Sequence, residues 1–556
     1  MLEVGNLFPK ILKPSVIGKN IMAVFEMPVI PINGFEAQLQ TTIVPQRGVG
    51  SPTFTRASTA YVFDWESIAR LVLSGEVRFQ GARRVYNLIP AAGTGSASLA
   101  VSAAKTITVA VGTYIFSMGA ESTGTAVITF TGTATGSTGT LTANATNRTS
   151  KTLTITGAGD IVATCTTMAA NNLLLENVTG QSNQNPSEYV SIGVVSAPYH
   201  GAGVDGVKYF KTLNGNTVAS NVVTEATGAA ITNANSSYAD ANGPFGYWAE
   251  GARADVLGTT AAIRRTMTDV GWVVGATMTV GSATGLDGVA SAGTSLTAGA
   301  VSATNTILFT TVLGSAARTY SVWVRRKTGT GTVSMTDNGG TNWTALTLTT
   351  TYQLFQVTRT QANPIVGFKI DTNLDAIEVD FNTIEAASFA NPTPIPVNVS
   401  KAVDSLTITI TGNISTTAFA CYAEGYIGAG TGVYQVMLNV NDGSDNNRYQ
   451  LYRNNANTSF GAYIASGGVQ QLATRPVNIA NGVSFKSAMS ADATSSNGFV
   501  NGTAGTAAAG ITLPTGLTTI RIGDDAPQSS PFFGAVKNVR IWQQPLTSIN
   551  CIILTR

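Results

Sequence analysis

Threonine alternates with leucine or isoleucine in several short runs of this 556-residue chain. Two clear examples are 152–156 (Thr-Leu-Thr-Ile-Thr) and 406–410 (Leu-Thr-Ile-Thr-Ile). A period of two with β-branched residues is typical of strands that bury one face. Clusters of turn-forming residues, such as 338–340 (Asn-Gly-Gly), separate these runs. The pattern predicts an all-β protein whose many short strands pack as sandwiches.

The charge composition excludes a general affinity for nucleic acids. The chain has 32 Lys and Arg against 30 Asp and Glu, and only 11% of its residues are charged. Soluble proteins average about 25%. A near-neutral chain has no strong general attraction for nucleic acid or for an anionic membrane. No uninterrupted apolar run reaches the ~18 residues of a membrane-spanning helix. We therefore expect neither nucleic-acid binding nor membrane insertion.

Histidine and cysteine are too scarce for the commonest metal and catalytic sites. His200 is the single histidine, which excludes a His-rich metal centre. Cys165, Cys421 and Cys551 lie far apart without a C-x-x-C pair, which excludes a disulfide scaffold and a zinc finger. Because no G-x-S-x-G elbow accompanies His200, we expect it in a turn or an interface. We predict no catalytic residue, no metal site and no cofactor.

Three further motifs have a functional interpretation and a simpler one. Residues 201–206 match G-x-G-x-x-G, but they enter a predicted strand instead of a helix, which favours a turn over a dinucleotide site. Glu378 and Asp380 alternate as in concanavalin-type glucanases, but Asn382 occupies the third acidic position, which favours an exposed strand face. Oxygen ligands for calcium are available between Asp442 and Asn446, where the spacing favours a hairpin turn. The residues concerned are Asp442, Ser444, Asp445 and Asn446.

An internal repeat divides the middle of the chain into two related units. Three pairs of landmarks are each separated by 206 residues: Tyr114 and Tyr320, Val178 and Ile384, and Asn185 and Asn391. Each unit follows a Gly-Ala-Arg, at 81–83 and 251–253. We predict one β-sandwich over 88–200 and a second over 255–397. A polar connector at 201–254 would join them.

The segment 54–60 (Phe-Thr-Arg-Ala-Ser-Thr-Ala), with Arg78-Phe79 and the Gly-Ala-Arg at 81–83, resembles the opening of a module in tailed-bacteriophage virion appendage proteins. This is the tail-fibre and head-fibre group. Glu-Gly-Ala-Arg at 250–253 repeats the exit motif, which in that family leads into a jelly roll similar to carbohydrate-binding modules. The resemblance implies this fold for 255–397, which also has Trp272.

Residues from about 405 to 556 resemble a laminin-G/concanavalin-type lectin sandwich, and we place this domain at 398–556. The resemblance rests on 449–452 (Tyr-Gln-Leu-Tyr), on 521–524 (Arg-Ile-Gly-Asp) and on a closing strand that ends at Trp542. It implies a lectin-like fold for this domain.

Aromatic side chains of this domain are candidates for sugar binding, because an aromatic face stacks against the apolar side of a pyranose ring. They are Tyr422, Tyr426, Tyr434, Tyr449, Tyr452, Tyr463 and Trp542. Alternation places Tyr449 and Tyr452 on opposite faces of one strand, so we expect one of them in the core, together with Trp542. The predicted glycan-binding residues are Tyr422, Tyr426, Tyr452 and Tyr463.

The N-terminal segment is apolar and punctuated by proline, which is typical of a segment that packs against another protein. We predict that residues 1–87 form a virion-anchoring region. The candidate anchor residues are Phe8, Phe25, Val29, Ile30 and Phe35.

Together these features predict tandem β-sandwich (jelly-roll) domains after an irregular N-terminal anchor. The resemblance implies a non-enzymatic tail fibre, made in the host cytoplasm and displayed on the virion surface. It would bind other virion proteins (tail, portal adaptor or capsid) and a host-surface polysaccharide, and the family also implies a homotrimer. Many weak sugar contacts would then act together through avidity. Two alternatives stay open: a capsid head fibre or decoration protein without a working sugar site, and a polysaccharide depolymerase.

Overall fold

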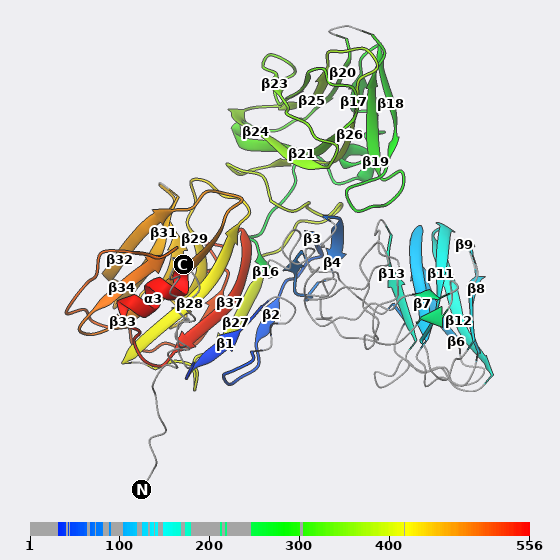
Figure 1. The fold of residues 1–556 in the computed structure, drawn as a ribbon. Coiled ribbons are helices and arrows are strands. Elements are labelled where there is room, and N and C mark those ends of the chain that lie inside the picture. The colour runs from blue at the N-terminus through cyan, green and yellow to red at the C-terminus, as the bar shows by residue number, and fades with distance from the viewer. Residues whose placement is uncertain are drawn as a thin grey trace, which may run out of the picture. The chain divides into compact units, whose positions relative to one another are not determined.

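The structure is a computed structural model, and Figure 1 shows its fold. It describes residues 32–39, 43, 45–63, 67–72, 74–81, 88–89, 104–118, 125–131, 134–137, 139–142, 148–167, 173–179, 212–213, 217–218, 246–300, 304–415, 417–456 and 458–556. Within these ranges nearly all regular structure is strand, and the two helices are short: α2 (Ala261–Arg264) and α3 (Ser548–Thr555). Neither is long and apolar enough to cross a membrane. The predicted all-β class with tandem sandwiches is confirmed.

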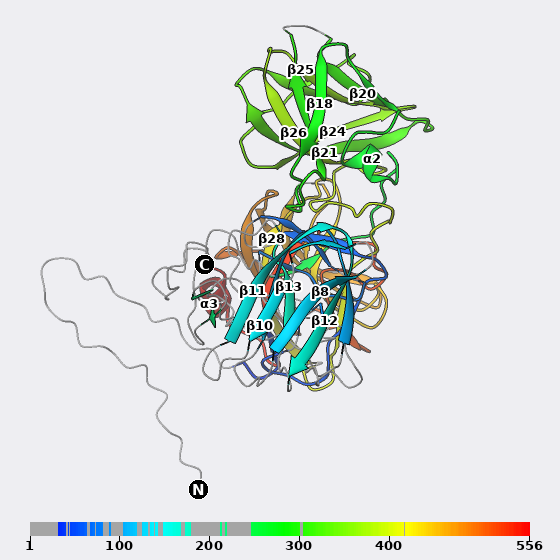
Figure 2. The same cartoon turned by 90° about the vertical axis from the view of Figure 1, so that its right-hand side faces the viewer.

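The first sandwich packs a four-stranded sheet, in the order β10-β8-β12-β6, against a sheet built around β7 and β11 (Figure 2). Its strands are β6 (Ala104–Val109), β7 (Gly112–Met118), β8 (Thr125–Thr131), β9 (Thr135–Gly136), β10 (Gly139–Thr142), β11 (Arg148–Gly157), β12 (Gly159–Thr167) and β13 (Leu174–Asn177). In β11, Leu153 and Ile155 are buried while Thr152 and Thr154 are exposed, as the alternation predicts. Two short strands from the expected connector, β14 (Thr212–Leu213) and β15 (Thr217–Val218), extend the second sheet.

The middle sandwich has two five-stranded sheets, in the orders β17-β20-β25-β22-β23 and β18-β19-β26-β21-β24. Its strands are β17 (Trp272–Val274), β18 (Met278–Ala283), β19 (Gly293–Ala298), β20 (Thr306–Thr310), β21 (Ala316–Thr328), β22 (Val333–Thr336), β23 (Thr344–Ala345), β24 (Gln353–Gln361), β25 (Ile365–Ile370) and β26 (Ala376–Glu385). In both repeat units the strand with the landmark tyrosine buries that ring, and it pairs antiparallel with the strand at the second landmark.

The C-terminal sandwich has a sheet in the order β35-β34-β33-β28-β37-β16-β5, which faces a seven-stranded sheet in the order β2-β27-β36-β29-β30-β31-β32. The strands from the C-terminal region are β27 (Ser405–Thr409), β28 (Ala418–Ile427), β29 (Gln435–Asn441), β30 (Arg448–Arg453), β31 (Ser459–Ser466), β32 (Val469–Asn478), β33 (Ser484–Asp492), β34 (Ser496–Val500), β35 (Thr503–Ala504), β36 (Thr519–Ile522) and β37 (Gly534–Trp542). One continuous apolar core fills the space between the two sheets.

Strands from far upstream complete this C-terminal sandwich. They are β1 (Phe35–Ala37), β2 (Thr53–Thr55), β5 (Phe79–Gln80) and β16 (Gly246–Ala249). β1 and β16 pair with β37, β5 extends β16, and β2 pairs with β27. The expected boundaries at 1–87 and 398–556 therefore do not separate two structural units. A further hairpin, β3 (Ala60–Phe63) with β4 (Ala69–Val72), packs Tyr61 edge-on against Phe381 of the middle sandwich at 5.1 Å.

This arrangement corrects one predicted anchor residue. The Phe35 side chain is 0% exposed and lies in the core of the C-terminal sandwich. The assignment of Phe35 to virion attachment is wrong, because a ring buried inside its own domain cannot contact a second protein. The other candidates, Phe8, Phe25, Val29 and Ile30, lie outside the described residues.

A fully buried ionic cluster ties these upstream strands to the C-terminal sandwich. Arg56 donates to Asp404 at 3.0 Å, and Arg78 pairs with both Asp404 and Glu250. Lys401 lies 3.0 Å from Asp404 and 3.7 Å from Glu250. Burial alone would raise the pKa of Asp404, but the three cations around it hold that pKa well below its usual value. A buried charge left without partners is costly, so the segments must fold together.

Candidate functional site

A pocket of about 400 Å³ opens on the outer face of the seven-stranded sheet of the C-terminal sandwich. Strands β29 to β32 supply most of its lining, and the loops before β29, before β30 and after β36 supply the rest. The lining residues are Tyr434, Val436, Asp445, Arg448, Gln450, Tyr452, Tyr463, Gln470, Arg475, Asp525, Ser529 and Ser530. We call this site the tyrosine pocket.

Strand alternation, interrupted by a β-bulge, aims these side chains outward. In β30, Tyr449 and Leu451 enter the core, so Gln450 and Tyr452 face the pocket side. The pairing of β29 with β30 shifts its register between Val436 and Leu438. The extra residue in β29 lets Val436 line the pocket while Leu438 remains in the core.

Three tyrosine rings form the aromatic part of the pocket. Tyr434 and Tyr452 are stacked with their centroids 6.3 Å apart, and Tyr463 meets Tyr452 edge-on at 5.9 Å. Tyr452 is almost fully covered, so it forms the floor. Tyr434 is 49% exposed and Tyr463 is half-buried, so these two rings present open surface to a ligand.

The guanidinium groups of two arginines lie above the tyrosine rings of the pocket. The Arg448 guanidinium lies 4.9 Å from the centre of the Tyr463 ring, and that of Arg475 lies 5.7 Å from the centre of Tyr452. Arg475 also donates a hydrogen bond to the Tyr452 hydroxyl. Rings and cations in this arrangement attract each other through the quadrupole of the ring.

A second irregularity in the sheet places Arg475. The register of β31 with β32 shifts between Phe460 and Ala462, so that Arg475 and Pro476 lie opposite Gly461. A Cβ at Gly461 would collide with the backbone of Thr474, so only glycine allows this close approach. Pro476 needs no ladder partner here, because β32 is the edge strand of its sheet.

Polar groups complete the site. Asp525 accepts hydrogen bonds from the backbone amides of Ser529 and Ser530 and from the Ser529 hydroxyl. Burial would raise the pKa of Asp525, but these donors lower it overall. Asn439, which pairs in register with Gln450, is fully buried, and within the described residues its amide nitrogen and oxygen both lack a hydrogen-bond partner.

The four predicted glycan-binding residues divide between two faces of the sandwich. Tyr452 and Tyr463 come together in the tyrosine pocket. Tyr422 and Tyr426 lie on β28 in the opposite sheet, where the Tyr422 hydroxyl donates to Glu424 at 2.9 Å. The two pairs therefore cannot contact one sugar. Trp542 lies in the core, as predicted.

The tyrosine that belongs to the core is Tyr449, which stacks on Phe419 at 4.7 Å. Tyr434 was a candidate but not one of the four predicted glycan-binding residues, and Arg448 and Arg475 were not candidates. Alternation within β30 gives the direction of the Arg448 side chain, but Tyr434 precedes β29 and Arg475 lies at a bulge in β32. Only long-range pairing shows that these two residues lie beside β30.

The other motifs fit structural roles in the described part of the chain. Asp380 is fully buried and makes two 2.8 Å contacts with Arg265, while Glu378 pairs with Arg325 at 2.6 Å. The expectation of an exposed strand face is therefore wrong, because arginines cover both carboxylates. Asp442 accepts hydrogen bonds from Ser444 and Asn447 within a turn. His200 and residues 201–206 lie outside the described residues.

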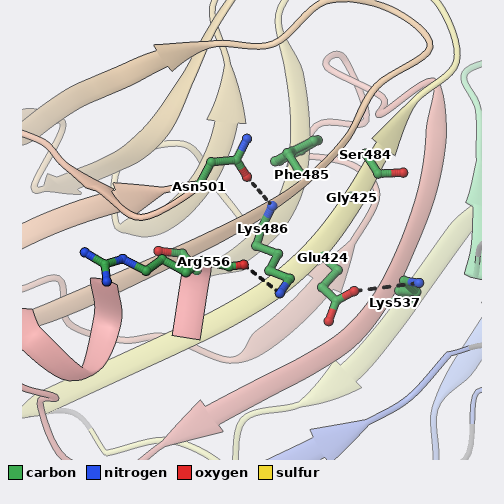
Figure 3. A pocket seen from close by; sticks show the side chains of 9 residues that line it. Glu424, Gly425, Ser484, Phe485, Lys486, Asn501, Lys537 and Arg556 are labelled. Atoms are coloured by element: carbon green, nitrogen blue, oxygen red, sulfur yellow. Dashed lines mark hydrogen bonds and ion pairs between the residues drawn. The ribbon is translucent and has the colours of Figure 1, made fainter. Parts of the chain in front are cut away.

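A second pocket, of about 290 Å³, lies on the other sheet of the same sandwich (Figure 3). Lys486 donates from its Nζ to the backbone oxygen of Arg556 at 2.9 Å, and Lys537 lies 3.7 Å from Glu424. Phe485, the aromatic residue among those that line it, packs in the core. This pocket has cations but no open ring face, so it suits a sugar less well than the tyrosine pocket does.

Comparison with known proteins agrees with this part of the fold. Residues 402–549 match the family model described as the concanavalin A-like lectin/glucanases superfamily. No curated protein matches the sequence.

Solved structures resemble parts of the chain at low identity. The chain is 19% identical to the CBM40 of the Ruminococcus gnavus IT-sialidase bound to α2,3-sialyllactose, covering 26% of this chain and 84% of that one, with a TM-score of 0.23. It is 11% identical to the CBM22-1–CBM22-2 tandem of Paenibacillus barcinonensis Xyn10C, covering 53% and 99%, with a TM-score of 0.19. For the LG1–3 region of the laminin α2 chain, the identity is 10%, the coverage 80% and 96%, and the TM-score 0.20. The family model that matches residues 402–549 therefore covers the C-terminal sandwich, which contains the tyrosine pocket.

Proposed function

We propose that the chain is a glycan-binding adhesin and that the tyrosine pocket is its sugar site. The observation that carries the proposal is the convergence of open tyrosine rings with fixed polar groups on one outer face. Tyr434 and Tyr463 offer ring surface, while Gln450, Arg448 and Arg475 offer hydrogen bonds. This is the combination that orients a sugar: apolar stacking on one side and directed polar contacts around the ring.

We further propose that the protein is a tail-fibre-type virion appendage that binds other virion proteins and host polysaccharide. The motifs at 54–60, 78–83 and 250–253 support this setting, because they resemble the openings of phage appendage modules. A binding role without catalysis agrees with the arginine-paired Glu378 and Asp380. Display of several copies on a virion, as trimers in the resembled family, would convert weak single-site contacts into firm attachment.

The sugar site is tested with the full chain on an array of bacterial-surface polysaccharides. Tyr434→Ala and Tyr463→Ala are each expected to weaken binding by about 2- to 12-fold, the loss expected for one aromatic contact of ~0.5–1.5 kcal/mol. Tyr426→Ala is the matched control, because Tyr426 is also half-buried but lies on the opposite sheet. Equal binding by all three variants would refute the tyrosine pocket as the sugar site.

The virion setting needs a separate measurement. Cryo-electron microscopy of the intact phage is expected to show density for this chain at the tail, with the C-terminal sandwich directed outward. Density on the capsid would support the head-fibre alternative. Absence of the chain from purified virions would refute both appendage assignments while leaving glycan binding intact.

A further inference from the structure

Arg475 is a pocket cation that the protein itself does not neutralise. It contacts the ring and the hydroxyl of Tyr452, and it forms no ion pair within the described residues. Arg265 and Arg325, which are also partly buried, do have carboxylate partners: Arg265 pairs with Asp287 and Asp380, and Arg325 pairs with Glu378. A guanidinium keeps its charge at any physiological pH, so Arg475 presents a positive charge at the pocket wall.

Arg448 leaves further donor capacity in the same pocket. Its carboxylate partner, Asp445, lies 3.4 Å away and is itself half-exposed. An exposed pair of this kind contributes little, and a ligand can compete with it.

Asp525 also lines the pocket and keeps its negative charge, but its oxygens are already occupied as hydrogen-bond acceptors. Asp525 is engaged by three donors from Ser529 and Ser530, which hold its carboxylate against its own loop. The groups left to contact a ligand are therefore the two guanidiniums, the rings of Tyr434 and Tyr463, and the half-exposed Asp445 that pairs with Arg448.

We propose that the tyrosine pocket selects an acidic saccharide, whose ring packs on the tyrosines and whose carboxylate pairs with Arg475. Arg448 supplies the second cationic contact. The planar guanidinium matches a carboxylate through two parallel hydrogen bonds, which a neutral hydroxyl cannot provide. This inference rests on the proposed function and names the ligand class of that same site.

The test is a glycan array with matched members, in which each glycan bearing a uronic or nonulosonic acid is paired with its carboxyl-reduced form. The full chain is expected to bind the acidic members at least about tenfold more tightly. Arg475→Gln is expected to reduce that binding by about 10- to 100-fold, the range for a charge-assisted hydrogen bond. Arg475→Lys keeps the charge but loses the planar fork, so it should recover only part of the affinity.

The control variant is Arg540→Gln. Arg540 also lies over a tyrosine ring, with 5.9 Å to the centre of Tyr422, but it belongs to the opposite sheet and pairs with Glu36. Its loss should leave binding unchanged.

The outcomes separate this inference from the proposed function. Suppose that the chain binds acidic and reduced glycans equally, and that Tyr463→Ala weakens this binding while Arg475→Gln does not. This result would overturn the acidic-sugar inference but would still support the tyrosine pocket as the sugar site. If neither Tyr463→Ala nor Arg475→Gln changes the affinity, or if the chain binds no glycan on the array, both the acidic-sugar inference and the proposed sugar site are overturned.

Discussion

The strand donated by the N-terminal segment gives the sharpest stability prediction. Phe35→Ala removes a fully buried ring from β1, between β37 and the core of the C-terminal sandwich. Truncation of a core Phe to Ala costs about 3–5 kcal/mol, with the higher values where the site cannot collapse. The site is closely packed, because the backbone of Glu36 is also hydrogen-bonded to the backbone of Arg47 and Gly48 lies close to the Phe35 ring.

Hydrogen exchange of β37 measures this cost directly, because its amides pair with β1 and become exchangeable when the sandwich opens. A loss of 3 kcal/mol or more accelerates exchange by over about 100-fold where opening is at equilibrium. Val49→Ala is the control in the same segment, since Val49 is 50% exposed and such changes stay within about 0.5 kcal/mol. Unchanged exchange in Phe35→Ala would show that β1 does not belong to this sandwich and would restore Phe35 as an anchor residue.

Three further predictions concern the same domain. Burial raises the pKa of Asp524 from 3.8 to about 8, so the unfolded state loses this proton at a lower pH than the folded state, and the free energy of unfolding falls as the pH rises from about 4 to 8. In denaturant titrations, Asp524→Asn should therefore stabilise the fold by about 1–4 kcal/mol at pH 8 and by little at pH 4. An equal effect at both pH values would contradict this. Arg78→Ala should destabilise the fold by about 3–5 kcal/mol, because it strips partners from buried Asp404 and Glu250; an unshifted denaturation midpoint would refute it. Residues 402–556 expressed alone should lack cooperative unfolding, because β37 loses β1 and β16; a sharp calorimetric transition would disprove this.

Local pattern was sufficient to predict the fold class and the direction of several side chains. The alternation in 449–452 separates a core tyrosine from a surface one, and the structure places Tyr449 inside and Tyr452 outside. The repeat landmarks likewise mark equivalent strand pairs, because each tyrosine lies in the core of its own sandwich.

Local alternation could not predict which distant strands pair with each other. Phe35 and Ala37 alternate around Glu36 like any half-buried strand, but an apolar segment looks the same whether its partner is another protein or a distant part of its own chain. For the same reason, alternation shows that Tyr422 and Tyr426 share a face of one strand without showing which sheet contains it. The bulge in β32 that positions Arg475 depends on β31 and cannot be read from either strand alone.

The most direct measurement is a crystal structure of the full chain soaked with an oligosaccharide that binds it in solution. We expect sugar density against Tyr434 and Tyr463, with an acidic group of the ligand at Arg475. Density confined to the face that carries Tyr422 and Tyr426, or to the pocket around Lys486, would contradict it.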